Sequence, residues 1–319
     1  MGGHWKNCTE HPEFHLVAFS RSVKLQFTLF SGTLLVYMLA IVGNIVITIL
    51  VCLVPQLHTP MYAFLCNLSV QDIIYVSAIL PKFLVITITG DTRISFLGCI
   101  TQMFLFVFCV GTEFLLLTSM AYDRYVAICI PLHYALIMSR RTCIILAAVS
   151  WLIGFLDSLA QSWMVVDLAC YSIQDINHFY CDLKAMIKLS SSDTKVIRTF
   201  LSVVCVVLGF LPFMLILTSY AFIISTIVKI RTTTGRVKAF SSCSSHLIVV
   251  ILFYGTSLVS YMKPESEASQ EEDKLLSLIY TAVVPMLNPI VYSLRNQEVL
   301  RSIKNIGRKC STCKLGLPG

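Results

Sequence analysis

Residues 27–53 read FTLFSGTLLVYMLAIVGNIVITILVCL, a stretch without a single charged side chain. A helix needs roughly 20 mostly apolar residues to cross the hydrocarbon core of a bilayer, and this stretch exceeds that length. Inside lipid, backbone polar groups are satisfied only within a helix or a closed barrel. Because the run does not alternate between apolar and polar residues as barrel strands do, it predicts a membrane-spanning helix.

Six further stretches share this character, although the second and the seventh span are interrupted by polar residues. The expected spans are 27–53, 60–85, 98–128, 142–163, 199–227, 239–262 and 275–294. We therefore expect an all-α membrane protein. Its parts are a seven-helix transmembrane bundle at 27–294, an extracellular N-terminal segment at 1–26, and a cytoplasmic tail at 295–319 with a short amphipathic helix.

The overall composition agrees with a membrane protein. Of the 319 residues, 56% are hydrophobic and only 13% are charged, whereas roughly a quarter of a soluble domain is charged. The chain cannot cover a core of this size with water-binding side chains. This excludes an ordinary soluble enzyme and, despite a net charge of +7, a nucleic-acid-binding domain.

The basic residues indicate the orientation of the chain in the membrane. Thirteen of the 24 Lys and Arg residues lie at 124–141, 229–238 and 295–319, which share one side if the chain crosses seven times. The acids of these segments and their borders are only Asp123 and Glu298. Cytoplasmic loops carry an excess of Lys and Arg. We therefore expect the C-terminus in the cytoplasm and the N-terminus outside.

Five motifs follow one another near the ends of the spans. They are LHTPMY at 57–62, MAYDRYVAIC at 120–129 followed by PLHY at 131–134, Ser-Tyr at 219–220, KAFSSCSSH at 238–246 and PMLNPIVYSLRN at 285–296. The set covers nearly the whole chain and resembles the vertebrate olfactory (odorant) receptors, which are rhodopsin-like G protein-coupled receptors. The resemblance implies an odorant receptor, not an enzyme. It would activate an olfactory-type stimulatory G protein, raise cyclic AMP and lie in the plasma membrane of sensory neuron cilia.

Two other functions share part of this pattern. A non-olfactory receptor that senses a metabolite would have the same fold and motifs. An ion channel or transporter could line its path with Asp72 and Glu113, because charged residues inside a membrane are usually functional. The absence of repeats between the two halves of the sequence, and the Asp-Arg-Tyr and Asn-Pro-Ile-Val-Tyr motifs, favour a receptor.

The resemblance also implies a switch at the cytoplasmic ends of the helices. Arg124 would pair with Asp123 at rest and meet the G protein once freed, while Tyr220 and Tyr292 swing inward. The alternative is an interfacial arginine whose head group reaches water. The residues expected to couple to the G protein or to switch are Asp123, Arg124, Tyr125, Tyr220, Lys238, Asn288, Pro289 and Tyr292.

Ligand sites of helix bundles form between the helices, so we expect the odorant in the outer half of this bundle. Helical spacing from Asp123 and family-like positions give the expected lining: Phe106, Val107, Val110, Gly111, Val204, Cys205, Leu208, Tyr254, Ser257, Leu258, Tyr261, Tyr280 and Thr281. The set is apolar and aromatic with a few hydroxyls, which favours a small neutral volatile. Any one of these residues could instead simply pack one helix against another.

Asp72, Glu113 and Asn288 lie in the middle of spans. The resemblance implies a polar cluster there that holds a structural sodium ion, since two neighbouring carboxylates need a cation or a proton between them. The alternative is that each pairs with a neighbouring helix. No other cofactor is expected. The expected partners are an odorant, a heterotrimeric G protein and membrane lipid.

Cysteines and one asparagine complete the expectations. Cys99 at the start of the third span and Cys181 in the long second outer loop would form a disulfide in an oxidising lumen. The family usually has a second bridge in this loop, but Ser191 stands where the partner of Cys170 is expected, which leaves Cys170 free. Asn7 in Asn7-Cys8-Thr9 would carry N-linked glycan.

Overall fold

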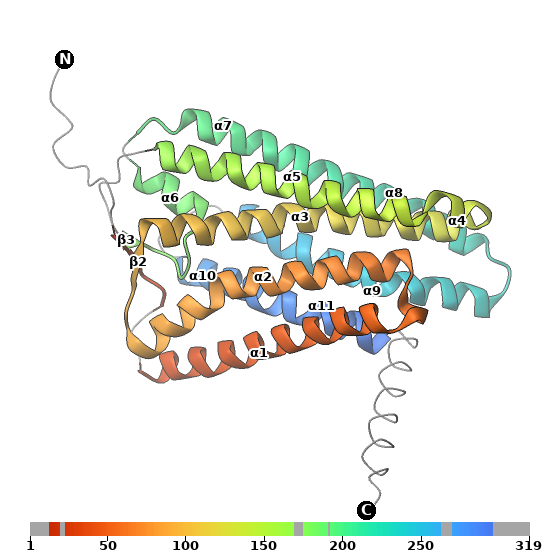
Figure 1. Cartoon of the computed structure of the whole chain (residues 1–319), viewed down its shortest axis with the longest axis horizontal. Helices are drawn as coiled ribbons and strands as arrows, with labels where there is room; N and C mark the ends of the chain where they lie inside the picture. The colour runs from red at the N-terminus through yellow and green to blue at the C-terminus, as the bar shows by residue number, and fades with distance from the viewer. Residues whose placement is uncertain (1–12, 20–22, 169–174, 191, 263–269, 296–319) are drawn as a thin grey trace, which may run out of the picture.

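The computed structural model describes residues 13–19, 23–168, 175–190, 192–262 and 270–295. Within them, seven helical segments are long and apolar enough to cross a membrane. Figure 1 shows these segments lying side by side as one elongated bundle. The expected all-α, seven-span fold is confirmed.

The spans are α1 (Val23–Leu53), α2 (Pro60–Thr89), α3 (Phe96–Cys129), α5 (Arg140–Asp167), α7 (Lys195–Val204) continuing through η3 (Cys205–Phe210) into α8 (Leu211–Lys229), α9 (Thr233–Met262), and α10 (Gln270–Leu278) continuing through η5 (Ile279–Val283) into α11 (Val284–Arg295). Short helices connect them: η1 (Pro55–Leu57), η2 (Pro131–His133), α4 (Tyr134–Ile137) and α6 (Leu183–Leu189). Several spans extend beyond their apolar runs. For example, α9 begins at Thr233 rather than 239, because a helix continues past the hydrocarbon core with polar residues.

Proline explains the irregular turns in two of the spans. Both η3 and η5 are π-helical, and they end shortly before Pro212 and Pro285 respectively. A proline has no N–H, and its ring clashes with the carbonyl four residues earlier. The carbonyl four residues before each proline belongs to Leu208 in η3 and to Thr281 in η5. The wider π turns therefore lie where the proline ring would otherwise clash with the backbone.

A small sheet closes one end of the bundle. Strand β1 (Glu13–Leu16) lies between β2 (Arg93–Ser95), to which it is antiparallel, and β3 (Asp175–Ile176), to which it is parallel. Phe14 and Leu16 are fully buried beneath it. We call this the sheet end and the opposite end, where α3 finishes, the Arg124 end (Figure 1). The sequence did not predict a strand within the N-terminal segment.

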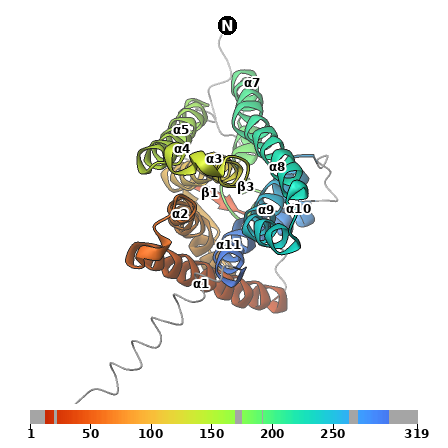
Figure 2. The ribbon, with the colours of Figure 1, turned by 90° about the vertical axis from the view of Figure 1, so that its right-hand side faces the viewer.

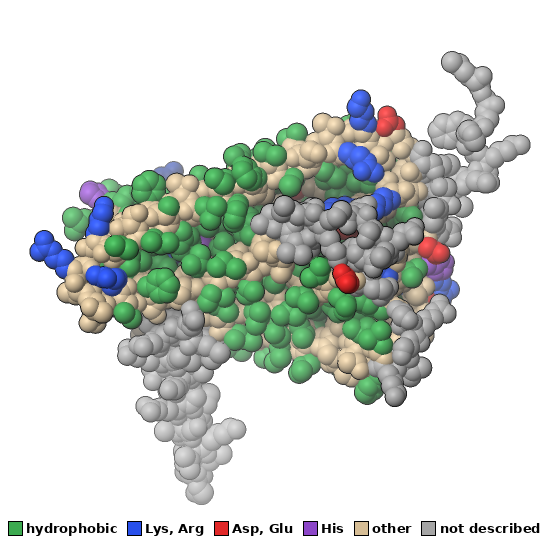
Figure 3. Space-filling model, turned by 180° about the vertical axis from the view of Figure 1, so that it is seen from behind, with side chains coloured by type: hydrophobic (Ala, Val, Ile, Leu, Met, Phe, Trp, Pro, Cys, Tyr) green, Lys and Arg blue, Asp and Glu red, His purple; other side chains and the backbone are tan. Residues whose placement is uncertain are grey.

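The outer surface of the bundle is suited to lipid. Large apolar side chains point outward along every span, as Leu35 of α1 and Leu215 of α8 do. Figure 3 shows apolar side chains over the middle of one face, with Lys and Arg gathered towards its ends. The polar side chains are concentrated inside instead, which is the arrangement expected when lipid is the outer solvent.

Helix α3 is the central element, and glycine lets α5 approach it. Figure 2 shows α3 between α5, α2 and α8. A Cβ added to Gly154 of α5 would meet Thr112 and would lie 2.9 Å from the carbonyl oxygen of Phe108, both on α3. Small residues allow this close approach where lipid provides no hydrophobic force between helices.

Replacing Gly154 with valine should therefore force α5 away from α3. We expect Gly154→Val to lower the free energy of unfolding by about 1–3 kcal/mol, the usual cost of overpacking. The measurement is thermal unfolding of the protein in detergent. Gly255→Ala in α9 is the matched control, because a Cβ there meets nothing within 4 Å and should be neutral or slightly stabilising. Equal stability of the Gly154→Val and wild-type proteins would contradict the packing.

Candidate functional site

Buried amides connect α1, α2 and α11 in the middle of the bundle. Asn44 of α1 donates from Nδ2 to the carbonyl oxygen of Pro285 in α11, at 3.1 Å. Asn288 of α11 donates to Oδ2 of Asp72 in α2, at 2.9 Å. The three polar side chains are almost fully buried. Three spans that are distant in the sequence are thus joined by hydrogen bonds that water cannot replace.

The same polar cluster continues to α3 and leaves several oxygens unpaired. Gln71 donates from Nε2 to Oε2 of Glu113, at 3.2 Å. Asp72 is close enough to Glu113 for two negative charges on these side chains to repel each other. Oδ1 of Asn44, Asp72 and Asn288 and Oε1 of Glu113 are buried and accept no hydrogen bond from the described residues. Unpaired buried acceptors are rare in proteins.

The unpaired oxygens are of the ligand type that the expected sodium ion would need, because hard cations take oxygen ligands. Two carboxylates, of Asp72 and Glu113, and two amides, of Asn44 and Asn288, supply them. Among the described residues no three His, Cys, Asp or Glu side chains converge on a metal position. A cation here would therefore depend on the amides as well as the carboxylates, and its charge would offset the two acids.

At the Arg124 end, one buried carboxylate holds two partners. Arg124 donates to Oδ2 of Asp123 from Nε at 3.1 Å and from a guanidinium NH₂ at 2.8 Å. Tyr134 of α4 donates its hydroxyl to Oδ1 of Asp123 at 2.8 Å. Burial and the nearby Asp123 charge raise the pKa of Tyr134, so the hydroxyl keeps its proton. The Arg124 side chain is only 15% exposed, which disagrees with a side chain that reaches for water.

A buried histidine joins three helices near this pair. Nε2 of His246 in α9 lies 3.1 Å from the carbonyl oxygen of Leu117 in α3, and Nδ1 lies 2.7 Å from the hydroxyl of Tyr220 in α8. A carbonyl only accepts, so Nε2 carries the proton and Nδ1 accepts from Tyr220. The motif at 238–246 contains His246, but the sequence alone assigned this residue no role. It belongs to the site together with Tyr220.

The other expected switch residues lie apart from one another. Tyr125 packs edge to face against a ring of α8, and Lys238 is exposed on α9. Pro289 packs closely against α1: a Cβ added to Gly43 would lie 2.8 Å from the Pro289 ring. The hydroxyl of Tyr292 is buried and has no hydrogen-bond partner within the described chain. Of the expected switch residues, Asp123 and Arg124 pair with each other and Tyr220 bonds to His246 of α9. Lys238 lies at the surface.

The expected disulfide at the sheet end is present. Cys99 of α3 is bonded to Cys181, and both residues are fully buried. Gln102 strengthens this link, because its Oε1 accepts the Cys181 N–H and its Nε2 donates to Ala78 O of α2, each at 2.9 Å. The segment that follows β3 is thereby held over the bundle.

Some expectations fall outside the described residues. They concern glycosylation of Asn7, the state of Cys170 and Ser191, and the amphipathic helix of the tail beyond Arg295. The side chains of Leu258 and Tyr261 are also outside the description, although both residues belong to α9.

Aromatic rings from four elements meet beneath the sheet end. The ring of Phe106 lies 5.6 Å from that of Tyr75 and 5.1 Å from that of Tyr180. Tyr280 lies 6.2 Å from Tyr75 and 6.5 Å from Phe106. Phe106 and Tyr280 were expected here. Tyr75 and Tyr180 were missed, because the expected lining drew no residues from α2 or the loop after β3.

A second aromatic layer lies deeper in the bundle. The ring of Tyr254 is 4.7 Å from that of Phe213 in α8 and 5.3 Å from that of Phe114 in α3. Phe253 lies 6.2 Å from Tyr280 and so connects the two layers. The Tyr254 hydroxyl is buried without a hydrogen-bond partner in the described residues. Among the expected lining residues whose side chains are described, it is a hydroxyl without a partner, whereas those of Ser257 and Thr281 are paired.

The remaining expected lining residues take several positions. Val110 packs against the apolar clusters of both halves of the bundle, and Val107 is buried beside it. The hydroxyls of Ser257 and Thr281 donate to carbonyls of their own helix turns, each at 2.8 Å. Val204 and Leu208 are half-buried. Of these residues, Val110 lies where the two apolar clusters meet.

Gly111 and Cys205 lie away from this group. A Cβ on Gly111 would be 3.4 Å from Cα of Gly154, so this face of α3 packs against α5. Cys205 is an exposed free thiol in η3. Gly111 was expected in the lining from helical spacing and Cys205 from its family-like position, and the structure places neither beside the aromatic layers. The α3 helix has neighbours on several sides, and the π turns of η3 depart from the 3.6-residue period.

Asp157 of α5 is a polar residue that the sequence reasoning overlooked. It is half-buried, accepts from Nε2 of Gln161 at 2.8 Å and has no donor for Oδ1 among the described residues. Its Oδ2 lies 3.8 Å from where a Cβ of Gly111 would be. A carboxylate in a membrane span is itself a usable signal, because such residues are rare and mostly functional.

Comparison with known proteins bears on the function of this arrangement. A family model described as olfactory receptor matches residues 33–309. Olfactory receptor 13F1 of Homo sapiens is 45% identical over 94% of this chain and 94% of its own length. Olfactory receptor 2B6 of Mus musculus is 46% identical over 95% and 96%. Putative olfactory receptor 2B3 of Homo sapiens is 42% identical over 97% and 99%.

Proposed function

The chain belongs to the olfactory receptor family, a family of receptors rather than enzymes, and we propose how it performs that role. It binds a small, neutral volatile between the two aromatic layers and activates an olfactory-type stimulatory G protein, which raises cyclic AMP. The observation that supports this most is the link between the layers and Arg124. Tyr254 and His246 belong to the same helix, α9. A ligand that contacts Tyr254 would therefore act through α9 on the bond between His246 and Leu117 O.

The proposed orientation places the Arg124 end in the cytoplasm and the sheet end outside. Arg140, Arg141, Lys229 and Arg231 are all exposed at the Arg124 end, and cytoplasmic loops carry such an excess of basic residues. The protein would then be a multi-pass protein of the plasma membrane, in sensory neuron cilia. The disulfide between Cys99 and Cys181 would lie on the oxidising side.

The lining supports a ligand class. The rings of Phe106, Tyr280 and Phe114 offer apolar and aromatic surface, and no Lys or Arg belongs to the two described layers. The free hydroxyl of Tyr254 offers one hydrogen bond. A small apolar molecule with a single acceptor oxygen satisfies both features, because a buried hydroxyl gains most from a partner that it lacks.

The proposed switch uses the contacts at the Arg124 end. When a ligand moves α9 relative to α3, the bond of His246 to Leu117 O changes together with the ring contact between Tyr254 and Phe114. Arg124 is then free to leave Asp123 and meet the G protein. The sodium ion proposed among the oxygens of Asp72, Glu113 and Asn288 would stabilise the resting state by offsetting two buried carboxylates.

Arg124→Ala tests the proposed coupling. Cells that carry an olfactory-type stimulatory G protein and a cyclic AMP reporter would be exposed to a broad odorant panel. We expect the odorant response of the wild-type receptor to be abolished in Arg124→Ala at equal surface expression. The matched control is Arg141→Ala, an exposed arginine at the same end, which should respond normally. An undiminished response of Arg124→Ala would contradict the role of Arg124, and ligand-gated current without any G protein would favour a channel.

Tyr254→Phe tests the ligand class. The substitution keeps the ring and its packing but removes the hydroxyl. For an activating ketone, ester or alcohol, we expect the half-maximal concentration to rise several-fold, up to about tenfold, the value of one neutral hydrogen bond. The response to a hydrocarbon of the same size should not change, and it serves as the internal control. Equal losses for both ligands would mean that Tyr254 acts through packing alone.

A further inference from the structure

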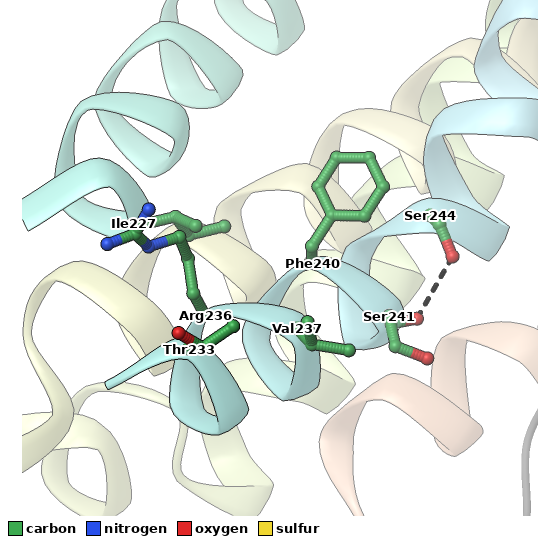
Figure 4. A pocket seen from close by; sticks show the side chains of 7 residues that line it. All are labelled: Ile227, Thr233, Arg236, Val237, Phe240, Ser241 and Ser244. Carbon is green, nitrogen blue, oxygen red and sulfur yellow. Dashed lines mark hydrogen bonds between the residues drawn. The ribbon is translucent and has the colours of Figure 1, made fainter. Parts of the chain in front are cut away.

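The surface between α8 and α9 holds a hollow at the Arg124 end. Its volume is about 480 Å³, which falls within the range of small-molecule sites, roughly 300–1,000 Å³. Ile227 of α8 and Val237 and Phe240 of α9 form its apolar wall, with Thr233 and Arg236 at the end of the bundle. Figure 4 shows the Arg236 guanidinium reaching back towards Ile227, while Phe240 projects from α9 further along the helix.

The α9 side of the apolar wall lies on the outside of the bundle. Val237 is 63% exposed and Phe240 is 57% exposed. On the same helix, Cys243 and His246 are buried, and His246 contacts α3 and α8. The groove face of α9 therefore points away from the core. On a membrane-spanning chain, apolar surface at this position meets lipid.

The groove carries positive charge without a countercharge nearby. Arg236 donates to the carbonyl oxygen of Ile230 at 3.2 Å, and neither described ion pair of the protein involves it. Lys229 of α8, Arg231 of the loop and Lys238 of α9 are exposed on the same stretch of chain. The sequence contains no Asp or Glu from residue 194 to residue 264, so α8, α9 and the loop between them supply no acid.

We propose that this groove binds an anionic phospholipid of the cytoplasmic leaflet. Its phosphate lies on Arg236, and one acyl chain follows Val237 and Phe240 along α9. Basic side chains close to a membrane surface attract anionic lipids, and a guanidinium pairs with a phosphate through two hydrogen bonds. A sterol would cover the apolar wall but leave Arg236 without an anion. The choice of leaflet rests on the orientation proposed above, whereas the binding itself needs neither odorant nor G protein.

The test is photolabelling of the full chain in lipid nanodiscs. Nanodiscs of phosphatidylcholine would contain a trace of phosphatidylserine with a photoreactive acyl chain, and labelled peptides would be mapped by mass spectrometry. We expect labelling of residues 227–244 in the wild type and about a fivefold loss in Arg236→Gln, the effect of one basic residue near the surface. Arg236→Lys should retain most of the labelling, and Arg141→Gln on α5 is the matched control that should not change it.

Three outcomes would overturn the proposal. They are equal labelling of Arg236→Gln and wild type, equal labelling by a photoreactive phosphatidylcholine, and labelling by a photoreactive sterol that phosphatidylserine does not displace. Thermal unfolding of each variant shows whether it is folded. Because labelling is read without odorant, a receptor that fails to raise cyclic AMP can still pass this test, and the two proposals fail separately.

Discussion

This fold depends on one constraint: polar side chains inside a membrane-spanning bundle must pair with each other, as Asn288 does with Asp72. Lipid is as apolar as a leucine side chain, so no hydrophobic force draws the helices together once they span a membrane. Polar side chains inside the bundle have no water and must pair with each other. Asn44 joins α1 to α11, Asn288 joins α11 to α2, and Gln71 joins α2 to α3 through Glu113. Together with close helix approaches such as that at Gly154, these bonds define which spans are neighbours.

The same constraint connects the two ends of the molecule. Towards the sheet end the interior is filled by aromatic rings around Phe106, and towards the Arg124 end by hydrogen bonds around His246 and Asp123. Helix α9 contributes to both regions. In the proposed mechanism, a molecule that alters the ring packing at Tyr254 changes the His246 contacts through α9. The bundle has few other ways to respond, because polar groups in lipid cannot exchange their partners for water.

Much of this arrangement could be predicted from the sequence, where the signal is local or chemically strong. The seven spans follow from length and apolarity, and the Cys99–Cys181 bond and the Asp123–Arg124 pair are present as expected. Strand β1 could not be predicted, because its partners β2 and β3 are brought to it by the fold and it is only four residues long. Gly111 faces α5 rather than the aromatic layers, since the helical period gives a face of a helix but not the neighbour that this face packs against.

The central claim is that paired polar groups hold the helices together, and a double-mutant cycle between Asp72 and Asn288 tests it most directly. The free energy of unfolding in lipid-like micelles would be compared for Asp72→Ala, Asn288→Ala, the double variant and the wild type. The account predicts a coupling energy of about 0.6–1.7 kcal/mol, the range from the average to the maximum measured for hydrogen bonds between membrane helices. Strictly additive losses, with no coupling between the two positions, would contradict it.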